Sequence, residues 1–338
     1  MKFKYLVIAF FLFAQSCSLS PKIGARNTDA VTQKEQQRIR HYLMSKHVNG
    51  SIAVVKQDKV IFNEGIGLAN RATRSVNRSS TTFPIGSITK VIVAACILQL
   101  QEKGKLSTED PVSTFIPNFP NGRHIKLIHL LNHTSGIEEN LFFHGKSKDM
   151  LKGISVKAPA GKKWDYNDIN YFVLGLVVEK ASGESLHHYI QKNIFDQASM
   201  THSGFMTQNR PVPYTSKSYI KTGDYAMPVT ILNMAKLWGC GDIYSTALDL
   251  CLFDQALLSG KLLTKRSLQE MLTPGSQSTY GEGVYINDNE VYSRGVVGGW
   301  ETLHVFFKDH TVMAILLNVR DMNINILQLT SDIKNIIH

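Results

Sequence analysis

The sequence has few cysteines, and their spacing does not indicate a disulfide-stabilised fold. It contains only 4 among 338 residues. Small secreted domains that depend on disulfides carry more cysteines at closer spacing. Cys96 lies in an apolar run, and Cys240 and Cys251 lie on either side of a helix start. We predict that these three are buried small side chains.

The sequence also lacks any apolar run long enough to span a bilayer as a helix, and a short apolar run stands at the N-terminus. Two lysines precede residues 5–13, an apolar stretch too short to span a bilayer as a helix. Small residues then lead to Cys17, which resembles a bacterial lipobox. We predict a signal peptide at residues 1–17, lipid and hence membrane attachment at Cys17, and a tether at residues 18–30. The alternative is an ordinary signal peptide that contains a cysteine; both predict export to the periplasm or cell envelope.

Acidic residues are outnumbered, because Lys and Arg total 37 whereas Asp and Glu total 27, a formal net charge of +10. Loss of residues 1–17, which hold two lysines and no acids, would leave 10 − 2 = +8. A basic exported chain favours anionic surroundings such as cell-wall polymer or lipid headgroups. No arginine–aromatic pattern typical of nucleic-acid binding is present, so we expect no nucleic-acid partner.

Internal repeats are absent, and the composition, 43% hydrophobic and 19% charged, is that of a globular protein. Alternating apolar residues predict strands near both ends of the chain. The predicted strands are 51–55, 59–62, 280–287, 289–296, 301–308 and 311–318, and terminal helices are predicted at 31–46 and 321–337. Residues 31–338 are therefore predicted to form an α+β domain: an antiparallel sheet covered by the terminal helices, with a helical insertion at about 105–240 and a cleft between them.

What the sequence does contain is a serine and a lysine at helical spacing, in front of a wholly apolar run. The pattern S-x-x-K occurs three times, at Ser87/Lys90, Ser218/Lys221 and Ser331/Lys334. Residues three apart share one helical face. Only Ser87 precedes a helix that is apolar on every side, where the helix dipole acts on its hydroxyl and burial is expected to lower the pKa of Lys90. Ser87 is thus the predicted nucleophile and Lys90 its base.

Residues 83–90, Phe-Pro-Ile-Gly-Ser-Ile-Thr-Lys, resemble the nucleophile segment of class C β-lactamases and their relatives. Those relatives are low-molecular-weight penicillin-binding proteins, D-amino-peptidases and β-lactamase-like esterases. The resemblance covers roughly residues 30–320 and recurs, in order, at 100–106, 110–112, 128–136, 170–175 and 245–250. It implies the β-lactamase/transpeptidase-like fold and a serine hydrolase that forms an acyl-serine intermediate and needs no cofactor.

The second motif of this family is Y-x-N, and the matching segment is Tyr166-Asn167-Asp168. The resemblance implies that Tyr166 shares general-base and general-acid work with Lys90; the alternative is a buried aromatic residue. Asp168 stands where the family usually has Asn, and a carboxylate cannot donate as an amide does. Asp168 could instead pair with Lys90 or bind an ammonium group on a substrate.

The third motif, K-T-G or H-x-G in the family, aligns with Val296-Val297-Gly298, so the cationic or polar residue is lost. The resemblance implies that Val296, Gly298 and Trp300 line the substrate site, although Trp300 could equally pack in the core. It also implies an oxyanion hole made by the backbone N–H groups of Ser87 and Gly299.

A literal K-T-G occurs at 221–223, but it lies before the 245–250 segment, and Gly223-Asp224 is typical of a turn. We therefore do not assign it to the site. His129 and His133 have zinc-compatible spacing, but no glutamate follows the first histidine, and no metal is expected.

The sequence thus predicts an exported serine hydrolase that acts on a small ester or amide, as an esterase or as a hydrolase of cell-wall D-peptides. The alternative is a catalytically weak or inactive lipoprotein that binds penicillin or muropeptides on the same scaffold. Intact Ser87, Lys90 and Tyr166 favour the enzyme, whereas Val296 and Asp168 favour the binding protein.

Overall fold

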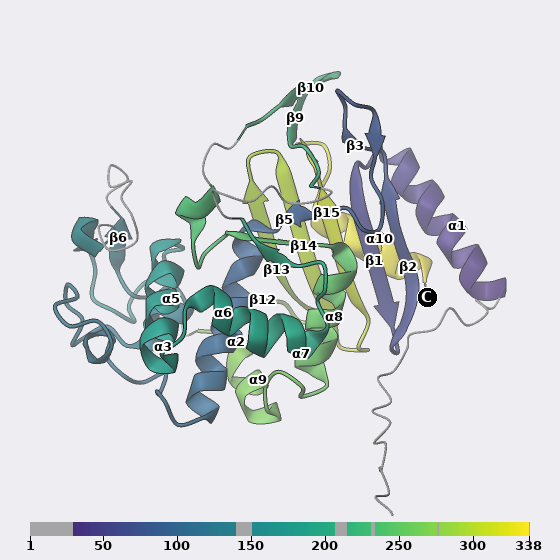
Figure 1. Cartoon of the computed structure of the whole chain (residues 1–338). Helices are drawn as coiled ribbons and strands as arrows, with labels where there is room; N and C mark the ends of the chain where they lie inside the picture. The colour runs from purple at the N-terminus through teal and green to yellow at the C-terminus, as the bar shows by residue number, and fades with distance from the viewer. Residues whose placement is uncertain (1–29, 140–150, 207–214, 231–233, 276, 338) are drawn as a thin grey trace, which may run out of the picture.

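The computed structural model describes residues 30–139, 151–206, 215–230, 234–275 and 277–337 (Figure 1). The predicted signal peptide, Cys17 and the tether up to residue 29 lie outside the described residues. Among the helices in the described ranges, none is long and apolar enough to cross a membrane.

A six-stranded antiparallel sheet forms the centre of the fold, in the order β12-β13-β14-β15-β1-β2 (Figure 1). Its strands are β1 (Gly50–Lys56), β2 (Lys59–Ile66), β12 (Tyr285–Ile286), β13 (Glu290–Val297), β14 (Trp300–Phe307) and β15 (Val312–Leu317). β1 pairs with β15, so that Gly50 is opposite Leu317 and Val55 is opposite Val312. The prediction of an antiparallel sheet built from both ends of the chain is confirmed.

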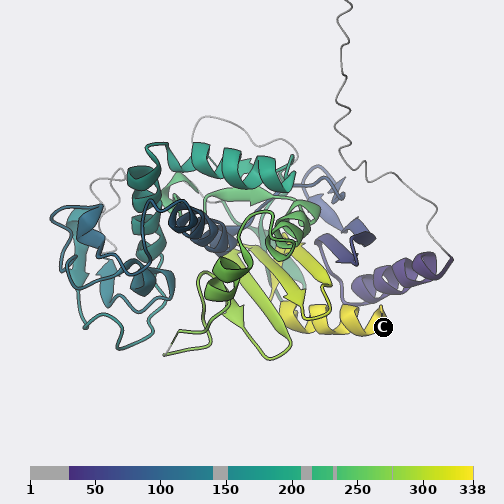
Figure 2. The same cartoon turned by 90° about the horizontal axis from the view of Figure 1, so that it is seen from below.

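Helices cover both faces of this sheet. α1 (Ala30–Ser45) and α10 (Ile326–Ile336) lie on one face, and α2 (Thr89–Glu102) and α8 (Ala247–Leu258) lie on the other (Figure 2). Successive side chains of a strand point to opposite faces. Ile52 and Val54 accordingly pack under α1 and α10, whereas Ala53 and Val55 face the side of the sheet covered by α8.

α2 is the most deeply buried helix near the cleft, because every residue from Thr89 to Leu100 is buried. This confirms the prediction of a helix that is apolar on every side. Each Ile, Leu or Val side chain buried in this way contributes roughly 1.5–3 kcal/mol. α5 (Ile169–Ser182) packs against α2 and ends at Gly183, whose φ of 77° suits a left-handed helix cap. The helix that carries Lys90 and follows Ser87 is thus rigidly held.

The region predicted as a helical insertion also contains short strands. Its helices are α3 (Leu127–Leu131), α5, α6 (Leu186–Ile190) and α7 (Asp196–Ala198). Its strands are β6 (Ile137–Glu139), β7 (Ile154–Val156), β8 (Gly204–Phe205), β9 (Tyr219–Thr222) and β10 (Tyr225–Pro228). Strands of two to four residues are too short to show an alternating pattern, so the sequence did not reveal them.

Several short elements complete the fold. They are β3 (Leu68–Asn70), β4 (Ser75–Val76), β5 (Phe83–Pro84), β11 (Ile243–Ser245), α9 (Lys265–Met271) and β16 (Val319–Asp321). The last helix was predicted from residue 321, but it begins at Ile326. The Asn325 side chain accepts the backbone N–H groups of Leu327 and Gln328 and so caps the helix there.

One buried carboxyl group has no compensating partner. Glu282, between α9 and β12, is 2% exposed, and both of its carboxyl oxygens lack a hydrogen-bond partner within the described part of the chain. Burial, assisted by the charge of Glu270, raises the pKa of Glu282 from 4.5 to about 8. The folded chain therefore binds this proton more tightly than the unfolded chain does, and folding stability falls as the pH rises from 4.5 to about 8.

We predict that Glu282→Leu raises the free energy of unfolding, relative to the wild type, more at about pH 9 than at about pH 5. The difference between the two pH values should be a few kcal/mol, since each pKa unit corresponds to about 1.4 kcal/mol. Denaturant unfolding of both proteins across this range measures the difference. Asp288→Asn, which changes an exposed carboxylate nearby, is the control. Parallel stability curves for wild type and Glu282→Leu would contradict the prediction.

Candidate active site

Ser87 lies in a tight turn that leads into α2. The turn is a 3₁₀ helix, Gly86–Ile88, and Gly86 has a φ of 53°. A Cβ on Gly86 would lie 2.8 Å from Cγ2 of Val297 and 3.3 Å from the backbone nitrogen of Val296. Glycine is therefore required both for the backbone angle and for the close approach of β13. The turn places Ser87 beside the end of β13.

Lys90 is completely buried, and its ammonium group has three acceptors. Nζ donates to Ser87 Oγ at 3.0 Å and to the backbone oxygen of Cys240 at 2.9 Å. The third is Asp168, whose Oδ1 lies 2.7 Å from Nζ in an ion pair. An ammonium group has three hydrogens, so each of them has a partner. The structure thus brings together Ser87, Lys90 and Asp168.

The expected fall in the pKa of Lys90 is wrong. Burial does lower the pKa of this ammonium group. The negative charges of Tyr166, Asp168 and Cys240 in their ionised forms, together with the hydrogen bond to Asp168, outweigh burial and raise the pKa above 10.5. Lys90 is therefore a cation at neutral pH, because Asp168 supplies a counter-charge that the apolar helix itself could not reveal.

Tyr166 packs directly beside this ammonium group. Nζ of Lys90 lies 5.2 Å from the centroid of the Tyr166 ring. The centroid of the His133 ring lies 4.3 Å from the same Tyr166 centroid. His133 also accepts the backbone N–H of Asn167 at Nδ1, at 3.2 Å. Burial, and then the charge of Lys90, hold the pKa of His133 well below its ordinary value. Neutral His133 thus fixes the Tyr166 segment, a role not predicted from the sequence, which indicated only a structural histidine.

Asp168 immediately precedes α5 and faces the opening of the site. Its side chain is 49% exposed, whereas that of Lys90 is 1% exposed. Of the two roles left open by the sequence, pairing with Lys90 is the one that the structure shows. The ion pair uses Oδ1, so Oδ2 lies on the side of the carboxylate away from this contact.

The backbone N–H of Gly299 is not available for an oxyanion hole, so this expectation is wrong. Gly298 has a φ of 57° and Val297 pairs with Trp300, which makes Gly298-Gly299 a two-residue hairpin turn. The N–H of Gly299 donates to Ser218 Oγ at 2.7 Å. A Cβ on Gly299 would lie 2.2 Å from the backbone oxygen of Tyr219, so β9 covers the turn.

The backbone group of β13 that faces the Ser87 turn belongs to Val296 instead. Val297 and Trp300 close the two-residue hairpin and form a hydrogen-bonded pair. Such pairs alternate with non-hydrogen-bonded ones along the strand. The N–H of Val296 therefore points away from β14, toward the part of the β13 edge that β12 leaves unpaired. Its nitrogen is the one that lies 3.3 Å from a Cβ built on Gly86.

The closely approached glycine of β13 is Gly295, since a Cβ there would lie 2.0 Å from the backbone oxygen of Ile85. The third motif therefore corresponds to Ser293-Arg294-Gly295, three residues before the predicted alignment. Ser293 Oγ donates to the backbone oxygen of Gly283 at 2.7 Å, and Arg294 Nε donates to Glu301 at 2.8 Å. Neither side chain replaces the family's lysine or histidine as a free donor.

Known proteins resemble this chain in sequence. The sequence model of the Beta-lactamase family matches residues 35–323. The chain belongs to the β-lactamase family. A Bacillus subtilis (strain 168) protein that carries the name penicillin-binding protein PbpX is 38% identical over 91% of this chain and 80% of its own length. The teichoic acid D-alanine hydrolase of Staphylococcus aureus (strain MRSA252) is 30% identical over 85% of this chain and 74% of its own length.

Solved structures show the same fold. FmtA from Staphylococcus aureus superimposes with a TM-score of 0.79 and 25% identity, covering 90% of this chain and 88% of that chain. D-amino acid amidase from Ochrobactrum anthropi superimposes with a TM-score of 0.78 at 18% identity, covering 91% of this chain and 98% of that chain, which shows the shared fold alone. The protein is a β-lactamase-family serine hydrolase with the α+β fold predicted for it.

Trp300 packs in the core of this β-lactamase fold and does not line the substrate site. It is 8% exposed and belongs to the hydrophobic core under α2. Its indole N–H donates to Ser216 Oγ at 2.9 Å. The packing role, which the sequence left open, is the one found.

The literal K-T-G segment has a structural role, as the turn pattern predicted. Lys221 and Thr222 end β9, and Gly223, with a φ of 58°, begins the turn to β10. Lys221 forms an ion pair with Asp321 at 2.7 Å. This lysine therefore does not serve Ser218, whose hydroxyl accepts the Gly299 N–H.

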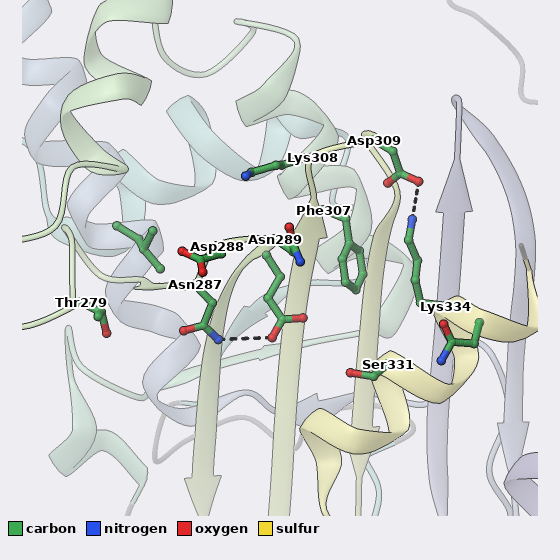
Figure 3. Close-up of a pocket in the computed structure, with 12 residues that line it drawn as sticks. Thr279, Asn287, Asp288, Asn289, Phe307, Lys308, Asp309, Ser331 and Lys334 are labelled. Atoms are coloured by element: carbon green, nitrogen blue, oxygen red, sulfur yellow. Dashed lines mark hydrogen bonds and ion pairs between the residues drawn. The ribbon is translucent and has the colours of Figure 1, made fainter.

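The third S-x-x-K pair lines a separate hollow of about 770 Å³ between α10, the β12–β13 turn and the β14–β15 turn (Figure 3). Lys334 donates to Asp309 and, at 2.8 Å, to Thr311 Oγ1, while Ser331 Oγ donates to the backbone oxygen of Leu327. Serine and lysine therefore have different partners here. Only Ser87 and Lys90 form the hydrogen-bonded pair that the family's chemistry needs.

The two histidines at zinc-like spacing serve separate contacts. His129 Nδ1 accepts the backbone N–H of Lys126 at 3.1 Å, whereas His133 Nδ1 accepts that of Asn167. Within the described ranges, no group of three or more His, Cys, Asp or Glu side chains is placed to hold a metal ion.

We predict that Asp168→Asn lowers the pKa of Lys90 by about 1–3 units, because the variant removes the carboxylate charge at 2.7 Å. The rate constant of Ser87 labelling by a fluorophosphonate is measured against pH. If Lys90 acts as a cation, the fall of this rate constant at alkaline pH will occur at lower pH in the variant. Asp165→Asn, which changes an exposed carboxylate just before Tyr166, is the matched control. Movement of the acid limb to lower pH instead would identify Lys90 as a base and contradict the prediction.

Proposed function

We propose that this protein hydrolyses small acyl esters through a covalent intermediate on Ser87. The single observation that carries the proposal is the hydrogen bond of 3.0 Å between the buried Lys90 ammonium group and Ser87 Oγ. Ser87 Oγ attacks the ester carbonyl while the phenolate form of Tyr166 takes its proton, and the resulting phenol then gives this proton to the leaving alcohol. Water releases the acid from Ser87 by the same steps. Lys90 remains charged and stabilises the negative charge that develops beside it.

The oxyanion hole of this reaction is proposed to consist of the backbone N–H groups of Ser87 and Val296. Both donors belong to segments held rigidly against each other at Gly86 and Gly295. Preorganised donors stabilise a tetrahedral oxyanion because they do not have to reorient during the reaction.

We further propose that the acyl group is an amino acid such as D-alanine, esterified to an anionic polymer of the cell envelope. A relative at 30% identity is named a teichoic acid D-alanine hydrolase. The half-exposed carboxylate of Asp168 offers Oδ2 to the ammonium group of such an ester. A substrate carboxylate lacks a comparable partner, because Arg294 already pairs with Glu301 and Val296 offers only an apolar side chain.

The second candidate is a penicillin- or muropeptide-binding protein with little turnover. The third-motif positions favour it, because the Ser293 and Arg294 side chains both have partners within the protein and neither replaces the family's lysine or histidine as a free donor. Such a protein would form an acyl-enzyme but release it slowly.

Export, with lipid attachment at Cys17 and a place in the cell envelope, is part of the proposal. It is supported by the short apolar stretch and the small residues before Cys17. Unchanged membrane association of a Cys17→Ser variant would contradict the lipid anchor.

We predict that the wild type hydrolyses a D-alanyl ester faster than the propionyl ester of the same alcohol, and both faster than a cephalosporin, judged by kcat/KM. The propionyl ester lacks only the ammonium group and is therefore the matched substrate. Ser87→Ala should abolish all turnover and all fluorophosphonate labelling, with the fold intact by circular dichroism. Stable labelling of Ser87 by a fluorescent penicillin without ester turnover would favour the binding protein, and labelling retained in Ser87→Ala would refute the nucleophile.

We predict that Val296→Pro lowers kcat by about 100- to 1,000-fold, because it removes one oxyanion donor. The substitution is compatible with the sheet, since this N–H faces the free edge of β13. Val296→Ala keeps the N–H and is the control, which should retain most activity. A Val296→Pro enzyme that folds and keeps wild-type kcat would exclude Val296 from the oxyanion hole.

A further inference from the structure

We infer that His187 and Asp242 are positioning residues, which set the place of the Lys90 ammonium group through the loop that holds the Cys240 carbonyl. The inference rests on the proposed function, because it assigns these residues to the same reaction. Neither belongs to the three motifs that define the site, and His187 lies on a different element, α6.

The two side chains form a close, largely buried contact. Nε2 of His187 donates to Oδ2 of Asp242 at 2.7 Å. The Asp242 side chain is 2% exposed, and that of His187 is 28% exposed. The imidazole ring also stacks on Phe205 of β8, with centroids 3.9 Å apart and planes 12° apart. A buried carboxylate that loses a donor is costly, so the position of Asp242 depends on His187.

Asp242 in turn fixes the loop that ends in β11. Its other oxygen, Oδ1, accepts the backbone N–H of Gly239 at 3.1 Å. The N–H groups of Cys240 and Gly241 both donate to the backbone oxygen of Leu237, at 2.9 and 2.7 Å. These bonds hold the peptide of Cys240, whose carbonyl receives the Lys90 ammonium group at 2.9 Å.

The same loop also touches the turn that carries the nucleophile. A Cβ on Gly241 would lie 3.6 Å from the carbonyl carbon of Gly86, and the N–H of Ile85 donates to Ile243 at 2.9 Å. A shift of the loop would therefore move an acceptor of Lys90 relative to Ser87 Oγ. A displacement of 1 Å in such a site costs up to about 100-fold in rate.

The charge on Lys90 offers a readout specific to positioning. The titratable groups that act on Lys90 or lie against it are Tyr166, Asp168, Cys240, His133, Tyr171 and Tyr285. A shift of the loop that removes the Cys240 carbonyl as an acceptor leaves Tyr166 and Asp168 in place but takes away one of the ammonium group's hydrogen bonds. The ammonium form is then less stable, so the alkaline limb of activity moves to lower pH.

The test compares His187→Ala, His187→Gln and His188→Ala in the full chain. His188 is the matched control, because it follows His187 on α6 but its side chain is 65% exposed and faces Glu184. The rate constant of Ser87 labelling by a fluorophosphonate is measured against pH, and thermal unfolding is recorded for each variant. Labelling of the wild type at Ser87 tests the nucleophile by itself, so a failure of the proposed function is visible separately.

We expect His187→Ala to lower the labelling rate constant by about 10- to 100-fold and to move the alkaline limb to lower pH. His187→Gln, whose amide can donate to Asp242, should restore most of the rate, and His188→Ala should match the wild type. If His187→Ala unfolds, Asp242→Asn, which keeps an acceptor for Gly239, is measured in its place and should show the same shift of the limb. A folded variant with an unchanged pH profile would overturn the inference. So would a folded variant in which a smaller fraction of the protein is labelled but the labelling rate constant is that of the wild type.

Discussion

The site depends on one buried cation whose three hydrogens all have acceptors. Lys90 comes from α2, and its partners come from the nucleophile turn, from the residue before α5 and from the loop before β11. A buried ammonium group without such partners would be expensive, so the three segments are stabilised in the one arrangement that satisfies it. The same contacts explain why Lys90 stays charged, since the carboxylate of Asp168 compensates for the water that burial excludes.

Much of this fold could be predicted because it is recorded in local patterns. The pattern of β1 predicts a strand and the uninterrupted apolar run of α2 predicts a helix buried on every side, and both predictions are confirmed, although β1 is buried on both of its faces. The spacing of Ser87 and Lys90 likewise follows from a single helical turn. The charge of Lys90 could not be predicted in this way, because it depends on Tyr166 and Asp168 in the segment before α5, and burial alone gives the opposite sign.

The third motif shows a different kind of limit. A glycine-rich stretch such as Gly298-Gly299 fits both a strand edge beside the nucleophile and a hairpin turn, and the sequence does not decide between them. The decision comes from Ser218 and Tyr219 on β9, which approach Gly299 from another part of the chain. Once the turn is placed there, hydrogen-bond alternation along β13 presents Val296 to the site instead. A register shift of this kind changes every backbone assignment on the strand at once.

The pairing of β1 with β15 also has a consequence for how the chain acquires its structure. Gly50 pairs with Leu317, so the sheet cannot be completed until the chain has been synthesised at least as far as residue 317. Until then the β1 edge of the first hairpin lacks its partner strand. Contacts between such distant segments slow folding and leave apolar surface exposed to aggregation. Formation of the β1–β15 ladder is therefore expected to be a late step in the folding of this protein.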